Sequence, residues 1–86
     1  MENVELINMG SNVNIVRIKD VDYIFSYSSN IMQVKGREIT EVGRDWDYSV
    51  TTSKHLNMCL RELGLGEIAN MTKAQKEKYF MERGLI

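Results

Sequence analysis

The chain has 86 residues, with 11 Lys and Arg against 12 Asp and Glu, and a formal net charge of −1. Hydrophobic residues make up 43% and charged residues 27%, an ordinary mixture for a soluble globular protein. These values exclude a basic nucleic-acid arm, a collagen, a disordered acidic tail and a two-domain enzyme. The length suits a single domain, residues 1–86, with one modest core.

The cysteine count and the hydropathy of the chain indicate its cellular compartment. The single cysteine, Cys59, cannot close an intrachain disulfide, which favours a reducing compartment. No stretch approaches the ~18 consecutive apolar residues of a membrane span. Residues 1–3 lack the basic and apolar regions of a signal peptide. We therefore expect a cytoplasmic protein that does not enter the membrane.

Residues 1–48 have the composition and spacing typical of β-strands separated by turns. Residues 4–9 form a β-competent segment, and residues 10–12 read as a turn. In the next segment, 13–18, apolar residues switch from one parity to the other, which predicts a bulge or a strand covered on both faces. Residues 19–22 are polar enough to turn the chain, and residues 23–27 alternate as a strand does.

A hairpin is predicted next, because residues 31–35 and 38–42 flank Gly36-Arg37. A two-residue loop with glycine first fits a type II′ turn. That register would place Lys35 opposite Glu38 and Val34 opposite Ile39.

A first helix is predicted over residues 49–64. The hydroxyl-rich run 49–53 can cap its start, and Gly64 can end it in a left-handed conformation. An apolar stripe at helical spacing should pack on the sheet; its members are Leu56, Cys59, Leu60 and Leu63.

A second helix is predicted over residues 72–83. Thr72 and Gln75 form a capping box at its start, and Gly84 ends it. Its expected core-facing residues are Ala74, Tyr79, Phe80 and Met81. The predicted fold is therefore α+β: a small antiparallel sheet of four or five strands, followed by two helices, the first packed on the sheet.

Aromatic residues are the candidates for contact with a partner. Tyr23, Phe25 and Tyr27 stand at period two, and this stripe can be a core face, a protein interface or a base-stacking surface. Trp46 can wedge a helix onto the sheet or anchor an interface. The candidate partner-binding residues are Tyr23, Tyr27, Arg44, Trp46 and Tyr48.

The start of the first helix is a candidate anion site. Free backbone N–H groups and hydroxyls at a helix N-terminus can bind phosphate, although Asp45 and Asp47 would oppose an anion. The alternative is that these hydroxyls only cap the helix. The candidate anion or nucleic-acid contacts are Thr51, Thr52, Ser53, Lys54 and His55.

No constellation indicates catalysis or a metal. His55 and Cys59 share a helical face, but a zinc site needs three or four such ligands, so we expect His55 at the helix surface and Cys59 buried. The aspartate pairs Asp20/Asp22 and Asp45/Asp47 sit at predicted turns, where turn chemistry explains them. We expect no cofactor, no metal and no enzymatic activity.

Two stretches carry a resemblance. The segment 22–28 (DYIFSYS) and the segment 46–57 (WDYSVTTSKHLN), about twenty residues later, resemble a group of small proteins carried by bacteriophages, prophages and plasmids. The resemblance covers roughly residues 15–63, and we expect the segment from about Gly66 to be particular to this protein. The resemblance implies that the protein works in a bacterial host cell. It does not imply any catalytic residues.

Small single-domain phage proteins often act by binding and blocking a host protein, as anti-CRISPR and other anti-defence proteins do. We therefore expect a non-enzymatic inhibitor or modulator of a host protein. The alternative is a small nucleic-acid-binding regulator, because residues 51–86 carry six basic and four acidic residues, against five and eight in residues 1–50. An exposed sheet edge would also allow two copies to pair as a homodimer.

Overall fold

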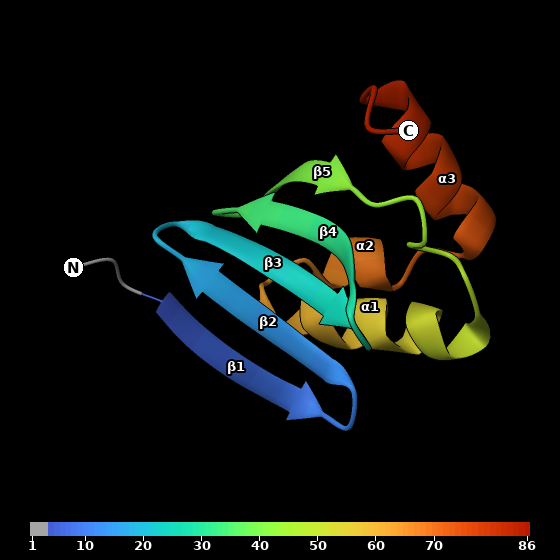
Figure 1. The fold of residues 1–86 in the computed structure, drawn as a ribbon. Coiled ribbons are helices and arrows are strands. Elements are labelled where there is room, and N and C mark those ends of the chain that lie inside the picture. The colour runs from blue at the N-terminus through green and yellow to red at the C-terminus, as the bar shows by residue number, and fades with distance from the viewer. Residues whose placement is uncertain (1–3) are drawn as a thin grey trace.

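The computed structural model describes residues 4–86. It forms one five-stranded antiparallel sheet followed by three helices, so the predicted α+β fold is confirmed (Figure 1). The strands lie in chain order: β1 (Val4–Gly10), β2 (Val13–Ile18), β3 (Val21–Ser26), β4 (Ser29–Lys35) and β5 (Glu38–Val42). The helices are α1 (Val50–Glu62), α2 (Gly66–Ala69) and α3 (Lys73–Glu82). Residues 1–3, which we used to argue against a signal peptide, lie outside the described residues.

The β4–β5 hairpin has the predicted register. Lys35 pairs with Glu38 and Val34 with Ile39, and Gly36 takes the left-handed φ of +64° that the tight loop requires. The predicted turn over 19–22 is shorter than expected, because Val21 and Asp22 already pair with β2.

Helix α1 crosses one face of the sheet, which we call the covered face (Figure 1). Its core stripe is confirmed, since Leu56, Cys59 and Leu60 are buried and Leu63 is half-buried. These side chains pack in one cluster with inward residues of the strands, among them Val13, Ile15, Ile24, Met32, Val34 and Ile39. Burying each large apolar side chain stabilises the fold by ~1.5–3 kcal/mol, which is enough to fix the helix on the sheet.

The ends of α1 follow the sequence. Ser49 is the N-cap, and its Oγ accepts a hydrogen bond from the Thr52 N–H at 3.1 Å. Gly64 ends the helix with φ +80°. The short helix α2 was not predicted. It forms because Leu65, Ile68 and Ala69 are buried beside α1, whereas the sequence pattern indicates only an exit from the first helix.

Helix α3 begins with the predicted capping box and packs through Phe80, whose ring meets Trp46 edge-on at 5.0 Å between centroids. The predicted contact face is only partly correct: Tyr79 is half-buried, but Ala74 and Met81 are exposed. Lys76 is buried instead. Its Nζ donates to the carbonyl oxygens of Met71 at 2.6 Å and Ala69 at 3.4 Å. The ammonium thus gives hydrogen-bond partners to carbonyl groups at the C-terminal end of α2. Burial lowers the pKa of Lys76, and nearby Arg61 lowers it further.

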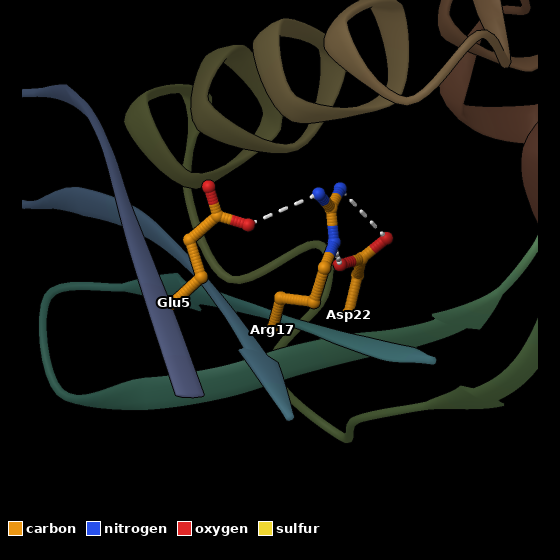
Figure 2. Close-up of polar contacts among 3 residues, drawn as sticks. All are labelled: Glu5, Arg17 and Asp22. Atoms are coloured by element: carbon orange, nitrogen blue, oxygen red, sulfur yellow. Dashed lines mark hydrogen bonds and ion pairs between the residues drawn. The ribbon is translucent and has the colours of Figure 1, made fainter. Parts of the chain in front are cut away.

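One polar cluster lies on the covered face (Figure 2). Glu5, Arg17 and Asp22 stand opposite one another on β1, β2 and β3. The Arg17 Nε lies 2.6 Å from Asp22 Oδ1, and Nη1 lies 3.3 Å from Glu5 Oε1. The hydrogen bond and charge of Asp22 raise the pKa of Arg17, with a smaller contribution from Glu5. The buried Asp22 carboxylate is thus paired, as a buried charge must be.

Candidate interaction surfaces

The face of the sheet opposite α1 is apolar across β1–β3. Residues alternate between the two faces, so the pairing register places one set of side chains together on the side away from the helix. We call this set the open face: Val4, Leu6, Asn8, Asn14, Val16, Ile18, Val21, Tyr23 and Phe25. Within residues 4–86 no helix lies on it (Figure 1), and Val4 and Leu6 are 62% and 67% exposed.

The open face explains one sequence expectation that was wrong. The parity switch in 13–18 is neither a bulge nor a strand covered on both faces: Val13 and Ile15 enter the core, whereas Val16 and Ile18 belong to the open face. The pairing of β2 with β3 is regular. The register shifts lie at Asn8/Gly10 where β1 pairs with β2, at Ile24/Phe25 where β3 pairs with β4, and at Gln33/Val34 where β4 pairs with β5.

The aromatic stripe is not a core face. Ile24 is the buried residue of this strand, together with the polar Asp22 and Ser26. Tyr23 and Phe25 are half-buried on the open face. Tyr27 leaves the strand altogether and lies in the turn between β3 and β4, so the three aromatic rings do not form one surface.

A second surface is a hollow at the start of α1, which we call the tyrosine groove. Its volume is about 540 Å³. The β3–β4 turn and the loop before α1 form its walls, and it is lined by Ser26, Tyr27, Ser29, Ile31, Asp45, Tyr48, Ser49, Thr51 and Thr52. Tyr27 and Tyr48 are 57% and 79% exposed, so their rings are available to a partner.

Ser26, which lines the groove, is paired with the buried His55. Ser26 Oγ and His55 Nδ1 are 2.8 Å apart, and the Tyr27 ring lies 5.7 Å from the His55 ring. His55 is therefore buried, which corrects our expectation of a surface position; Cys59 is buried as expected. Burial raises the pKa of the Cys59 thiol to about 12, with Glu62 adding to the shift.

A Ser–His contact is the geometry of an activated nucleophile. Ser26 lines the groove but is only 3% exposed, so little of its side chain meets a molecule in the groove. Within residues 4–86 no three His, Cys, Asp or Glu side chains gather as metal ligands. The pair ties α1 to the end of β3.

The candidate partner-binding residues are divided among three places. Tyr27 and Tyr48 meet in the tyrosine groove, and Tyr23 belongs to the open face. Arg44 is exposed in the loop after β5 and does not line the groove. Trp46 is buried against Phe80, so it holds α3 and cannot serve as an exposed anchor.

The candidate anion contacts do not form one site. Thr51 and Thr52 line the groove, but Ser53 lines a smaller hollow beside Trp46 and Lys73. Lys54 is exposed beside Met9, and His55 turns into the core. A helix advances by 100° per residue, so five consecutive residues cannot share one face. The residue that sequence analysis undervalued is Asp45, which we had explained as turn chemistry and which lines the groove.

A family model described as a family of unknown function (DUF8033) matches residues 3–83. The chain belongs to this family. The match includes α3, so the segment after Gly66 is part of the family pattern and not particular to this protein. No curated protein and no solved structure matched the chain. None of the described helices has the length and hydropathy to cross a membrane.

Proposed function

We propose that this protein acts by binding another protein through the open face, without catalysing a reaction. The supporting observation is that β1–β3 present apolar side chains on both faces while α1 covers only one. Contiguous exposed apolar surface is costly to leave in water and marks interaction sites. Full burial of Val4 and Leu6 in a complex would contribute roughly 1–2 kcal/mol each.

The partner that we propose is a host protein in the bacterial cytoplasm. The resemblance of segments 22–28 and 46–57 to phage, prophage and plasmid proteins supports this setting, and an anti-defence inhibitor of the anti-CRISPR type fits it. The charge of the open face favours a protein over nucleic acid, because its β1–β3 positions carry no lysine or arginine. A DNA and RNA titration at low salt tests the nucleic-acid alternative directly.

The experiment compares two matched charge insertions, Leu6→Lys on the open face and Met81→Lys on α3, where the side chain is 60% exposed. Each variant and the wild type are immobilised and exposed to host lysate, and captured proteins are identified by mass spectrometry. We expect a stoichiometric partner that wild type and Met81→Lys retain and that Leu6→Lys binds about tenfold more weakly or worse. Equal capture by all three would contradict the use of the open face.

A second copy of the chain is the competing occupant of the open face. Sedimentation of the wild type and of Leu6→Lys tests it. A monomeric wild type supports the proposal. A wild-type dimer that Leu6→Lys dissociates would mean that the second copy covers this face, and the proposal for a host partner there would fail.

A further inference from the structure

We propose that the tyrosine groove receives a positively charged side chain, an arginine guanidinium or a lysine ammonium, from a protein partner. The inference rests on the proposed function in that the protein partner supplies the side chain. It concerns a different surface, on the side of the sheet where α1 begins.

The Asp45 carboxylate at the groove is exposed and differs from the other aspartates of the chain. The other aspartates each have a cation: Asp22 pairs with Arg17, Asp20 with Lys35 at 3.6 Å, and Asp47 with Lys73 at 3.5 Å. The Asp45 carboxylate has no ion pair within residues 4–86, and the groove that it lines contains no lysine or arginine. A cation from outside the chain would therefore be complementary to the charge of this groove.

Two exposed tyrosine rings, those of Tyr27 and Tyr48, also line the groove. A cation over the face of a tyrosine ring is attracted by the negative potential of the ring. The chain makes such a contact elsewhere, where the Arg83 guanidinium lies 3.6 Å from the centroid of the Tyr79 ring. Tyr27 and Tyr48 offer two more rings beside Asp45, and no cation of the described chain lies over either ring.

The backbone at Tyr27 has an uncommon conformation for an aromatic residue. Its φ is +56°, in the left-handed region that glycine and asparagine tolerate and aromatic residues avoid. The turn is held there by a hydrogen bond from the Tyr27 N–H to the Asn12 carbonyl at 2.7 Å. The Tyr27 ring contacts the His55 ring on one side, and its exposure of 57% in a conformation that aromatic residues avoid supports a role in binding.

The N-terminus of α1 disfavours a cation in the groove, because its partial positive charge attracts anions. Its donors are partly occupied, however, because Ser49 Oγ already accepts from the Thr52 N–H and contacts the Thr52 hydroxyl at 3.1 Å. The helix end carries about half a unit charge, whereas the Asp45 carboxylate carries a full one. The cation is therefore the favoured occupant.

The test is an NMR titration of the ¹⁵N-labelled full chain with N-acetyl-arginine methylamide. The neutral N-acetyl-glutamine methylamide and inorganic phosphate serve as parallel probes. We expect saturable shifts of the backbone amides of Tyr27, Asp45, Tyr48 and Thr51 with the arginine probe only. Saturation with phosphate alone, or no saturable shift with the arginine probe up to its solubility, would overturn the proposal.

Two variants with matched controls locate the site. Asp45→Asn should weaken arginine binding roughly two- to fivefold, the size expected for an exposed ion pair, while Asp20→Asn should not. Tyr27→Asn should abolish the shifts and yet unfold at the same or a higher temperature, because asparagine tolerates the left-handed backbone. Tyr27→Phe should retain binding. Unchanged binding in Asp45→Asn or Tyr27→Asn would contradict the assignment.

The two proposals fail separately. Leu6→Lys lies on the opposite face of the sheet and should leave the arginine titration unchanged. If the titration fails while Leu6→Lys still loses the captured partner, only the groove is wrong. If the titration succeeds while all variants capture equally, only the open face is wrong.

Discussion

Ser26 and His55 are 29 positions apart in the chain, and their side chains meet at 2.8 Å in the interior. The contact joins the last residue of β3 to the second turn of α1. It fixes where the helix begins relative to the β3–β4 turn. The position of the helix start in turn determines how Tyr27, Asp45 and Tyr48 come to line one groove.

We expect Ser26→Ala to lower the free energy of unfolding by ~1–3 kcal/mol, because it leaves His55 Nδ1 buried without a partner. The matched control is Ser28→Ala in the same turn, which is exposed and should change stability by less than ~0.5 kcal/mol. Urea denaturation measures both. A double variant with His55→Ala should cost less than the sum of the single changes, and strict additivity would contradict the pairing.

The two faces of the sheet should respond differently to the same substitution. Leu60→Ala should cost ~2–5 kcal/mol, because Leu60 is fully buried in the core. Leu6→Ala should cost less than ~0.5 kcal/mol, because Leu6 is mostly exposed on the open face. Thermal unfolding of the two variants compares them. A large loss from Leu6→Ala would mean that this face is buried in solution.

Helix α3 should depend on one aromatic contact. Phe80→Ala removes the edge-on partner of Trp46 and should cost ~3–5 kcal/mol if α3 unfolds with the rest of the domain. Trp46 is the only tryptophan of the chain, so its fluorescence should shift to the red as water reaches the ring. Met81→Ala, at an exposed position of the same helix, should leave the emission unchanged. An unshifted emission in Phe80→Ala would contradict the packing.

In the cluster of Glu5, Arg17 and Asp22, the pair of Arg17 with Asp22 should contribute more to the free energy of unfolding than the pair of Arg17 with Glu5. Arg17→Ala leaves the buried Asp22 carboxylate without its cation and should cost ~1–3 kcal/mol, less than a fully buried pair because the Arg17 side chain is 40% exposed. Glu5→Gln should cost less than ~0.5 kcal/mol, because Glu5 is exposed and bonded at 3.3 Å. Chemical denaturation at constant salt measures both, and equal losses would contradict this ranking.

The Cys59 thiol should be inert in the folded protein. Burial raises its pKa to about 12, so almost no thiolate is present at pH 8 and disulfide reagents should react only through unfolding. Ser28→Cys, in an exposed turn, is the fast-reacting control. Because the pKa of Cys59 is higher in the folded protein, the thiol of the unfolded chain ionises first as pH rises. The free energy of unfolding should therefore fall above the ordinary pKa of a thiol and should not change near neutrality. Labelling of native Cys59 at the control rate would contradict this.

Local chemistry made much of the fold predictable. The Gly36-Arg37 loop implied the register of β4 and β5, and the hydroxyl-rich run 49–53 and the capping box at Thr72 marked the helix starts, because turns and caps depend on neighbours only a few residues away. The stripe of Leu56, Cys59 and Leu60 identified the buried side of α1, since helical periodicity is local too.

The candidate surfaces were not predictable in the same way. Periodicity assigns Val16 and Ile18 to one side of a strand, but it does not say which side receives a helix. Only the packing of α1 made one apolar face a core and left the other open. The burial of His55 and Trp46 likewise depends on Ser26 and Phe80, which are distant in the chain.

By itself, the sequence determined the strands, the helix caps and the alternation of side chains, because these follow from short-range sterics and hydrogen bonding. Only the tertiary structure decided which apolar side chains stay in water and which charges stay unpaired. Those outcomes depend on which distant segments meet, and the energy of each contact exists only once both partners are in place.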